Sequence, residues 1–499
     1  METELKFALS PEARRRVERY LDRAGHDGAR QVKVLNTTYF DSPDRKLSKA
    51  GFTLRVRELT ADAQRFRQTV KSSGNGTFER QEWEWAVDGP QPDLGRLAEV
   101  AAFPLQGVTG ADIRPVFRTE ITRTIVTLRP AAGAKIELAL DEGAVVASSG
   151  SQPVRELELE LKEGQPAALM RLGLELLETV PLSLLIESKA QRGFQLVDGA
   201  RPHPHEEESI SLEGGLSLKE AFRVLAARLV DDLMAHQPVV LHGDSQEGVH
   251  RMRIDVRRLR SLLVLFEPFL EAHAAGHFED ELRRLGQVLG AARDWDVFLE
   301  ETLPRTVDGA ADLVLARSLR ELASQRRHSA HQAAKKALLE APFSRFVLAM
   351  RLWTSEKGAV LKRFAPRPLE DEAPAMLSRL ERKVGKRLRA CDVDQPTSLH
   401  RLRKSLKKLR YGIQYLQSLY DGDAESYLAR CNALQKRLGN INDLGTFTRL
   451  AEELAQGTRL DLAPAVGMVA ENAERLAKKD LDRLGGRLSR FAKARPFWT

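Results

Sequence analysis

Glu2-Thr-Glu-Leu-Lys6 opens the chain and already shows the pattern that decides the fold of its first part. Side chains alternate between the two faces of an extended strand, so Glu2, Glu4 and Lys6 share one face. Two neighbouring carboxylates repel each other and need a cation, and such a pair suits Mg²⁺ or Mn²⁺. An ordinary edge strand with a solvated face has the same pattern, and for this segment alone that interpretation is favoured.

The same construction recurs in strand-like segments over the first two hundred residues, which changes the balance between these interpretations. The segments are Phe52–Glu58, Arg65–Lys71, Gln81–Val87, Arg118–Leu128, Lys135–Leu140 and Arg155–Lys162. Charges of one sign tend to share a strand face, and this is unfavourable unless something lies between them. Closing such strands into a barrel would set acidic strands opposite basic ones, an arrangement that suits a metal-bound polyphosphate.

Length and composition limit the class of protein. A chain of 499 residues with 42% hydrophobic residues is too long for one core, so two or more domains are expected. Its two cysteines, Cys391 and Cys431, imply no disulfide framework. The start lacks the features of a signal peptide and there is no run of eighteen apolar residues, so the cytoplasm is expected and a membrane is not.

Charge and periodicity divide the chain into two parts. Residues 1–200 contain 28 basic and 29 acidic residues, whereas the remainder contains 50 basic and 41 acidic residues. The basic excess therefore lies in the second part and indicates a polyanionic partner there. A first domain over 1–197, a linker over 198–215 and a helical domain over 216–499 follow from the change to helical spacing of apolar residues.

The helical part contains an internal repeat, predicted as 216–366 and 370–499. Val249-His-Arg-Met-Arg-Ile-Asp-Val-Arg-Arg-Leu-Arg260 aligns with Leu399-His-Arg-Leu-Arg-Lys-Ser-Leu-Lys-Lys-Leu-Arg410. Each copy places one histidine and three basic residues on one helix face. The eight residues are His250, Arg253, Arg257, Arg260, His400, Arg403, Lys407 and Arg410. A solvated basic face is the simpler interpretation, but few acidic residues accompany these rows, which favours a bound polyanion.

The first domain resembles the CYTH family, also called triphosphate tunnel metalloenzymes. The resemblance rests on motifs in the order of the family. They are Glu2-x-Glu-x-Lys6, Thr38-Tyr-Phe-Asp41, Lys49-Ala-Gly-Phe-Thr-Leu-Arg-Val-Arg57, Thr69-Val-Lys71, Phe117-x-Thr119 with Arg123, Glu137-x-x-x-Asp-x-Gly143, Glu156-Leu-Glu-Leu-Glu160 and Ser188-Lys-Ala-Gln-Arg-Gly193. The resemblance implies an α+β multidomain protein whose first domain is a closed antiparallel barrel of eight strands with a polar tunnel and flanking helices.

Roles for individual residues also follow from this resemblance. Those expected to bind substrate phosphates are Lys6, Arg55, Arg57, Lys71, Arg123, Lys189 and Arg192. Those expected to hold Mg²⁺ or Mn²⁺ are Glu137, Asp141, Glu158 and Glu160. Glu2 and Glu4 are expected to be catalytic, by positioning a second metal or the attacking water. Arg118, Glu82 and Glu84 are further candidates, for which ion pairs lining the barrel are an equally good explanation.

The chemistry implied is metal-dependent hydrolysis of a terminal phosphoanhydride. Inorganic triphosphate is the first choice of substrate, because nothing in the sequence indicates a base-binding pocket. A thiamine or nucleoside triphosphatase, an exopolyphosphatase and a non-catalytic polyphosphate-binding or granule-associated protein remain alternatives. No Walker A sequence, zinc-protease motif or nucleophile elbow is present to support another hydrolase class.

The helical part resembles the CHAD domain, with His250 and His400 as its marker histidines. This implies two pseudo-symmetric helical bundles that bind inorganic polyphosphate along a basic groove, and an association with polyphosphate granules. Arg251, Arg258, Arg401 and Lys408 are expected to extend that surface. DNA or RNA fits less well, because no aromatic residues are interleaved with the basic ones. The combination resembles bacterial inorganic triphosphatases.

Overall fold

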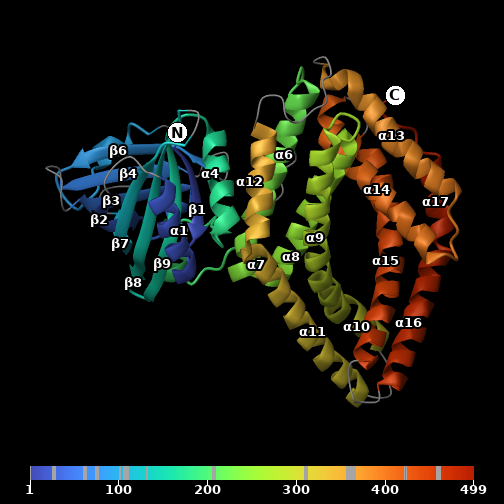
Figure 1. The fold of residues 1–499 in the computed structure, drawn as a ribbon. Helices are drawn as coiled ribbons and strands as arrows, with labels where there is room; N and C mark the ends of the chain where they lie inside the picture. Colours follow the sequence, from blue (N-terminus) through green and yellow to red (C-terminus); the bar gives the residue numbers. More distant parts are fainter. Residues whose placement is uncertain are drawn as a thin grey trace. The chain divides into compact units, whose positions relative to one another are not determined.

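The structure is a computed structural model, and it divides into two compact units (Figure 1). The residues it describes are 2–24, 30–59, 65–72, 78–100, 103–104, 112–130, 133–204, 210–307, 313–355, 367–420, 422, 424–456 and 462–498. The strand unit comprises Met1–Pro204, Met234–Asp244 and Leu338–Ser355. The helical unit comprises His205–Leu233, Ser245–Ala337 and Glu356–Thr499.

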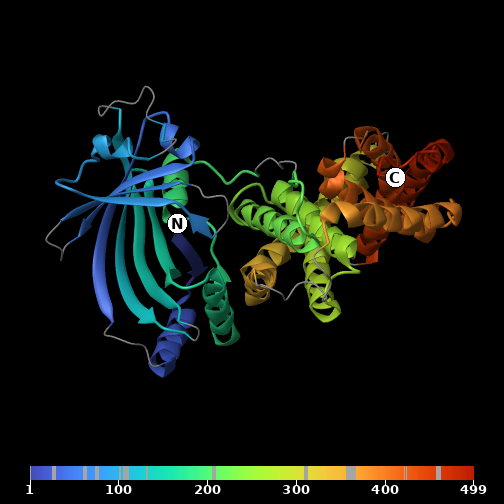
Figure 2. The same cartoon turned by 90° about the horizontal axis from the view of Figure 1, so that it is seen from above.

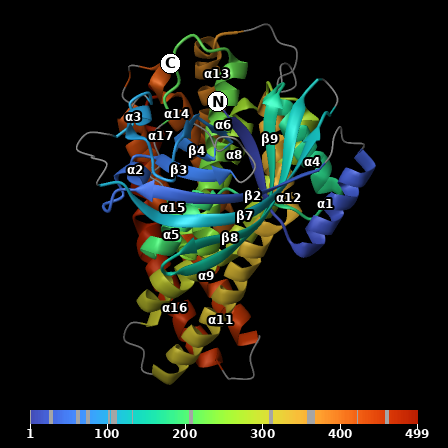
Figure 3. The ribbon, with the colours of Figure 1, turned by 90° about the vertical axis from the view of Figure 1, so that its left-hand side faces the viewer.

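One antiparallel sheet dominates the strand unit. Its described strands are β1 (Glu2–Ala8), β2 (Gln31–Asp41), β3 (Phe52–Leu59), β4 (Phe66–Ser72), β5 (Glu79–Arg80), β6 (Glu82–Val87), β7 (Arg114–Leu128), β8 (Lys135–Ala147), β9 (Gly150–Glu163) and β10 (Ser183–Leu184). Their hydrogen-bonded order is β10-β1-β9-β8-β7-β2-β3-β4-β6, and β5 pairs with β1. The strands bend strongly, as Figure 2 and Figure 3 show from two directions.

The expected closed barrel of eight strands is wrong. Nine strands form an open path between β10 and β6, with β5 outside it. The edge of β1 that would complete the ring is shared by two short partners. β10 pairs with Phe7 and Ala8, and β5 pairs with Glu2 and Thr3. Because each partner contributes two residues, no continuous ladder joins β1 to β6 in the described part of the chain. The mixed α and β composition, the antiparallel sheet of the first part and the helical second part are the parts of the prediction that hold.

Both faces of this sheet are covered, one by charged side chains and the other by apolar packing. The helices of the strand unit are α1 (Pro11–Ala24), α2 (Lys46–Lys49), α3 (Leu94–Leu97), α4 (Pro166–Thr179), α5 (Lys189–Asp198), α7 (Gln237–His242) and α12 (Ala341–Ser355). On β3, Leu54 and Val56 join a buried cluster with Leu47 and Leu97 of α2 and α3. The alternate residues of the strand, Arg55 and Arg57, therefore point to the opposite face.

Long helices form the helical unit. They are α6 (Leu218–Ala235), α8 (Ser245–Phe266), α9 (Ala272–Val297), α10 (Leu303–Val307), α11 (Leu313–Leu339), α13 (Leu369–Arg389), α14 (Pro396–Leu416), α15 (Ala424–Gln456), α16 (Ala463–Asp482) and α17 (Leu484–Ala492). A π-helical turn, η1 (Phe298–Thr302), continues α9, and a 3₁₀ turn, η2 (Gln417–Leu419), continues α14. None of the helices in the described part of the chain is long and apolar enough to cross a membrane.

A pair of backbone hydrogen bonds relates the two halves of the helical unit. The amide of Leu218 donates to the carbonyl of Arg367 at 3.3 Å, and the amide of Leu369 donates to the carbonyl of Leu216 at 2.8 Å. The two bonds are equivalent under the repeat, because Leu369 lies 151 residues after Leu218 and Arg367 lies 151 residues after Leu216. These bonds join the residues that begin α6 and α13, and α8 packs against α14 in the same unit.

Candidate functional site

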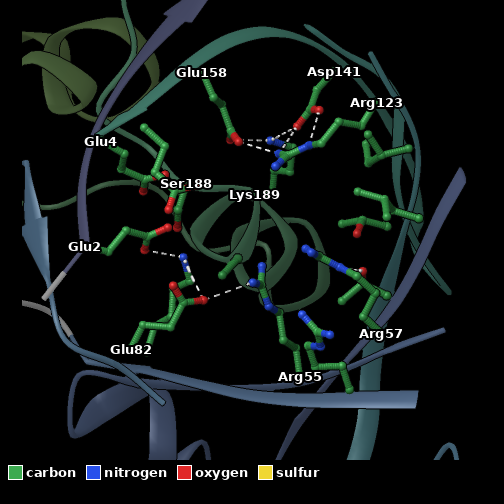
Figure 4. A pocket seen from close by; sticks show the side chains of 18 of the residues that line it. Glu2, Glu4, Arg55, Arg57, Glu82, Arg123, Asp141, Glu158, Ser188 and Lys189 are labelled. Atoms are coloured by element: carbon green, nitrogen blue, oxygen red, sulfur yellow. Dashed lines mark hydrogen bonds and ion pairs between the residues drawn. The ribbon is translucent and has the colours of Figure 1, made fainter. Parts of the chain in front are cut away.

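A cavity of about 320 Å³ lies on the charged face of the sheet. Every strand from β1 to β9 contributes to its lining, together with the start of α5. Figure 4 shows the side chains of Glu2 and Glu4 on one side and those of Arg55 and Arg57 on another, all pointing inward. Of the residues expected to bind phosphate, hold a metal or be catalytic, all but Arg192 line the cavity.

Strand register brings three carboxylates into one row. Glu4 on β1 lies opposite Glu160 on β9, and Glu160 lies opposite Glu137 on β8. Directly opposite residues in an antiparallel pair have Cβ atoms about 5 Å apart, so like charges there repel. The pKa of Glu160 is accordingly raised, first by burial and then by Glu2 and Glu137, although Lys162 opposes this rise. The negative charge of Glu160 is therefore compensated only in part by Lys162.

Glu2 and Glu4 differ in charge environment although they are two residues apart. Burial raises the pKa of Glu2, and the attraction of Lys71, at 2.5 Å, only partly offsets it. Burial would also raise the pKa of Glu4, but Lys6, at 2.7 Å, and Lys71 lower it to about 2. Glu4 is thus ionised at neutral pH, while Glu2 accepts a proton more readily than an ordinary glutamate.

A second set of carboxylates is already neutralised by cations. Oxygens of Asp141, Glu156 and Glu158 lie within 4.8 Å of one another, and all three residues are buried. The Nζ of Lys189 contacts all three, at 2.8, 2.5 and 2.8 Å. Arg123 contacts Asp141 at 2.6 Å and also Glu158. Despite burial, these cations hold the pKa of Glu158 well below its usual range, and the carboxylates raise the pKa of Lys189.

Arg57 stands apart from the other cations of the cavity. Its guanidinium bonds to Thr37 Oγ1 at 3.2 Å, and it has no carboxylate ion pair among the described residues. Burial, with Arg55 and Arg123 nearby, lowers the pKa of Arg57 to about 9. Burial would raise the pKa of the neighbouring Tyr39 hydroxyl, yet Arg55 and Arg57 lower it. This corner of the cavity is consequently short of negative charge.

The donor set fits a hard divalent cation. Among described residues, the acidic row and the set of Asp141, Glu156 and Glu158 offer carboxylate oxygens. Mg²⁺ and Mn²⁺ prefer such ligands. The raised pKa of Glu160 indicates a position where added positive charge would stabilise the folded protein. Glu137 and Glu160 lie in the acidic row, whereas Asp141 and Glu158 lie beside Lys189 and Arg123.

The structure divides the further candidates and Arg192 between the cavity and its surroundings. Glu82 pairs with Lys71 at 3.2 Å and with Arg55 at 3.4 Å, so it belongs to the cavity network. Glu84 lines the cavity too. Arg118 is exposed and pairs with Glu120 instead. Arg192 lies behind the cavity, paired with Glu156.

Two buried residues had no role assigned from the sequence. Glu156 forms ion pairs with both Lys189 and Arg192. The alternation of glutamates at 156, 158 and 160 was the available signal for it. Tyr39 lies within the quoted Thr38–Asp41 motif, but its packing against Phe117, with ring centroids 4.5 Å apart, depends on tertiary structure.

In the helical unit, four cations from the repeated helices gather. They are Arg253 and Arg257 on α8, and Arg403 and Lys407 on α14, here called the central basic cluster. Burial, followed by Arg403, Arg257 and Arg253, lowers the pKa of Lys407 to about 6. Arg253 pairs with Asp294 at 3.1 Å and Arg403 approaches Asp443 at 3.9 Å. Arg257 and Lys407 make no ion pair within the part of the chain that the structure describes.

The outer members of the two predicted rows have other partners. Arg260 pairs with Glu279 at 2.7 Å, and Arg410 bonds to Asn432 at 3.2 Å. The Nδ1 of His400 lies 2.7 Å from Asn442 Oδ1, and burial, then Arg293, lowers the pKa of His250. Arg258, expected to extend the surface, is buried beside Asp232.

Two family models match the chain. The CYTH domain model matches residues 1–194, and the CHAD domain model matches residues 224–452. Both matches confirm the resemblances seen in the motifs.

Two relatives and one solved structure are also similar to this chain. An inorganic triphosphatase of Haemophilus influenzae is 27% identical over 271 residues, which cover 50% of this chain and 73% of that protein. An uncharacterized protein of Mycobacterium tuberculosis is 25% identical, covering 93% of this chain and 91% of its own length. The CHAD domain from the plant Ricinus communis is 29% identical with a TM-score of 0.51, covering 59% of this chain and 98% of that structure.

Proposed function

Because this chain is a CYTH–CHAD protein, we propose that it hydrolyses inorganic triphosphate to diphosphate and phosphate and binds polyphosphate through its helical region. One observation carries the enzymatic part of the proposal. The cavity combines the acidic row of Glu4, Glu160 and Glu137 with the cation-rich corner of Arg55 and Arg57. A metal-bound chain of phosphates has the matching distribution of charge.

The basic side chains of the cavity would grip the substrate. Arg57 is available without breaking an ion pair in the described structure, while Arg55, Lys71, Arg123 and Lys189 would exchange a carboxylate for a phosphate oxygen. Lys6 pairs with Glu4 and would contribute in the same way. Arg192 would act indirectly, by holding Glu156 next to Lys189. Such contacts stabilise the charge that develops on the transferring and leaving phosphates.

Divalent metal fits the acidic side. Glu160 and Glu137 would hold Mg²⁺ or Mn²⁺, with Asp141 and Glu158 beside them. When bound, the metal would polarise phosphate oxygens and favour ionisation of water. Because its pKa is raised, Glu2 is suited to accept the proton of the attacking water, while ionised Glu4 orients that water. The new bond joins water oxygen to terminal phosphorus, and the anhydride bond to the leaving diphosphate breaks.

The lining favours a substrate without an aromatic base. Tyr39 is the one aromatic residue among the described residues around the cavity, and its hydroxyl lies among arginines. A stacking platform for adenine or thiamine is therefore lacking in this described lining. The related inorganic triphosphatase supports the same substrate.

A substrate panel tests this proposal. Purified protein with Mg²⁺ or Mn²⁺ should release phosphate from tripolyphosphate faster than from ATP, thiamine triphosphate or long-chain polyphosphate. Faster turnover of long chains would instead indicate an exopolyphosphatase. If no triphosphate is hydrolysed with any divalent metal while polyphosphate still binds, the protein is a polyphosphate-binding protein without this activity.

The central basic cluster supports polyphosphate binding by the helical region. Burial and neighbouring like charges lower the pKa of Arg403 and that of Lys407, and a polyanion lying between such charges would stabilise them. Binding of long-chain polyphosphate should weaken steeply as salt rises, because counterions are released. Binding that does not respond to salt would contradict this proposal. An association with polyphosphate granules would be a consequence of the same surface.

A further inference from the structure

By sequence, α7 and α12 fall within the CHAD match, but in the structure they pack in the strand unit. We infer that α12 supports β1 from the side opposite the cavity. This support positions Glu2 and Glu4 in the cavity. The inference rests on the proposed function, and it assigns a positioning role to residues outside the CYTH match. Figure 1 shows α12 alongside α4, the helix that packs against β1 and β9.

Gly173 of α4 marks the closest approach. A methyl group built there would lie 2.8 Å from Leu348 of α12, 3.1 Å from Leu5 and 3.5 Å from Phe7. The absence of a side chain at Gly173 leaves room for Leu348 of α12 and for Leu5 and Phe7 of β1 around the same point. Leu5 and Phe7 are fully buried on the face opposite Glu4 and Lys6, so movement of this layer moves the catalytic face of the strand.

A second contact joins α12 to the edge of β1 through β10. The backbone amide of Leu184 donates to Ser344 Oγ at 2.8 Å, and beside it Ser183 donates to the carbonyl of Leu339, the last residue of α11. Leu184 is the ladder partner of Phe7, and the amide of Leu185 donates to the carbonyl of Lys6 at 2.8 Å. Ser344 is fully buried, so removing its hydroxyl would leave a buried amide without a partner.

A third contact is linked to the backbone of Glu4 through Phe78. The guanidinium of Arg351 lies 5.7 Å from the ring centroid of Phe78, within cation–π distance. The carbonyl of Phe78 accepts the amide hydrogen of Glu4 at 3.0 Å. Three separate contacts from one helix therefore converge on the same strand.

Substitutions in the full chain test this support. Leu348→Ala removes the contact at Gly173, and Ser344→Ala removes the bond to β10. Leu348→Met keeps the side-chain volume, so this variant should retain most of the wild-type exchange rate and activity. Arg345→Ala is the matched control, because Arg345 is exposed on the same helix. Hydrogen exchange of the peptide covering residues 2–8 and steady-state kinetics with tripolyphosphate are measured for each variant.

Both disruptive variants should exchange the β1 amides roughly tenfold faster, because this segment opens locally more often. Their kcat should fall about 10-fold to 100-fold, as expected for a small misplacement of catalytic groups. The KM for tripolyphosphate should change little, because most of the phosphate grip comes from β3, β4, β7 and α5. Arg345→Ala should resemble the wild type in both measurements.

Unchanged exchange at β1 in both disruptive variants would overturn the inference, as would a rise in KM at constant kcat. An equal effect of Arg345→Ala would also overturn it. Failure of the proposed function is distinguishable, because exchange is measured without substrate. If the wild type hydrolyses no triphosphate, faster exchange in Leu348→Ala and Ser344→Ala still supports the structural role of α12.

Discussion

The cavity of the strand unit and the central basic cluster of the helical unit use similar side chains in opposite ways. In the cavity, most cations contact carboxylates, and the pKa of Lys189 and that of Arg123 are raised despite burial. In the central basic cluster, burial and then the neighbouring cations lower the pKa of Arg253, that of Arg403 and that of Lys407. Both sites contain lysine and arginine, and they differ in how many carboxylates lie close enough to neutralise those cations.

This comparison indicates two kinds of anion binding. A cavity whose cations already have partners can bind a short phosphate chain by exchanging carboxylates for phosphates, provided that a divalent cation neutralises the released carboxylates. The central basic cluster is compensated only in part, by Asp294 and Asp443, so it attracts a sufficiently long polyanion and is stabilised by it. Arg57 is the exception in the cavity, since its pKa is lowered to about 9.

The largest expected effect concerns catalysis in the compensated cavity. Glu4→Gln keeps the shape of Glu4 but removes its charge, so kcat for tripolyphosphate should fall about 10²-fold to 10⁴-fold. Circular dichroism should show that the fold persists. Glu163→Gln, at the exposed end of β9, is the control and should keep full activity. Full activity in Glu4→Gln would show that Glu4 is not a catalytic residue.

The second effect tests compensation directly. Lys189→Met leaves three buried carboxylates without their shared cation, and breaking such a buried pair typically costs about 3–5 kcal/mol of unfolding free energy. Denaturant unfolding measures this loss. Lys135→Met breaks the exposed pair with Glu163 and should cost less than about 1 kcal/mol. Equal costs would show that the cavity network does not stabilise the fold as described.

The third effect tests the central basic cluster. Arg257→Gln should weaken binding of long-chain polyphosphate about tenfold and reduce the slope of affinity against salt by about one. Lys404→Gln, an exposed change on α14, is the matched control and should have a smaller effect. Titration at several salt concentrations provides both quantities. An equal loss in the control would point to diffuse surface charge instead of the cluster.

The smallest expected effect is a pH dependence. The pKa of Lys407 in the folded protein, about 6, is below its ordinary value of 10.5, so unfolded protein binds more protons between these values. Stability of the helical unit should therefore rise with pH through this window. A bound polyanion favours the charged lysine, so affinity should rise as pH falls from about 8 to 6, with uptake of less than about one proton.

Calorimetric titration in two buffers of different ionisation enthalpy measures that proton uptake. Lys407→Met should abolish most of it, which separates Lys407 from His250 and His400 on the same two helices. If the wild type takes up no proton, Lys407 is not the group that responds to polyphosphate. If Lys407→Met keeps the full uptake, one of the histidines is responsible.

Much of the site could be predicted because strand alternation is a local property. Glu2, Glu4 and Lys6 share a face in any extended conformation, and so do Arg55 and Arg57. The row of Glu4, Glu160 and Glu137 could not be predicted in this way, because it depends on register between three strands. A slip of one residue would turn each set of charges to the other face.

Whether the sheet closes into a barrel could not be predicted from the sequence either. The alternating segments predict strands but not the edge that each strand will use, and the edge of β1 is divided between β5 and β10. The role proposed for α12 shows the same limit. Its sequence belongs with the helical repeat, while its contacts with Gly173, Leu184 and Phe78 belong to the strand unit.

By itself, the sequence determined which side chains share a strand face and which two families the chain resembles. These properties follow from periodicity and short motifs, and they need no knowledge of distant contacts. The tertiary structure alone decided which charges are neutralised, since Lys189 meets Asp141, Glu156 and Glu158 only after folding. Electrostatic compensation depends on distances across the fold, and the order of residues along the chain does not specify those distances.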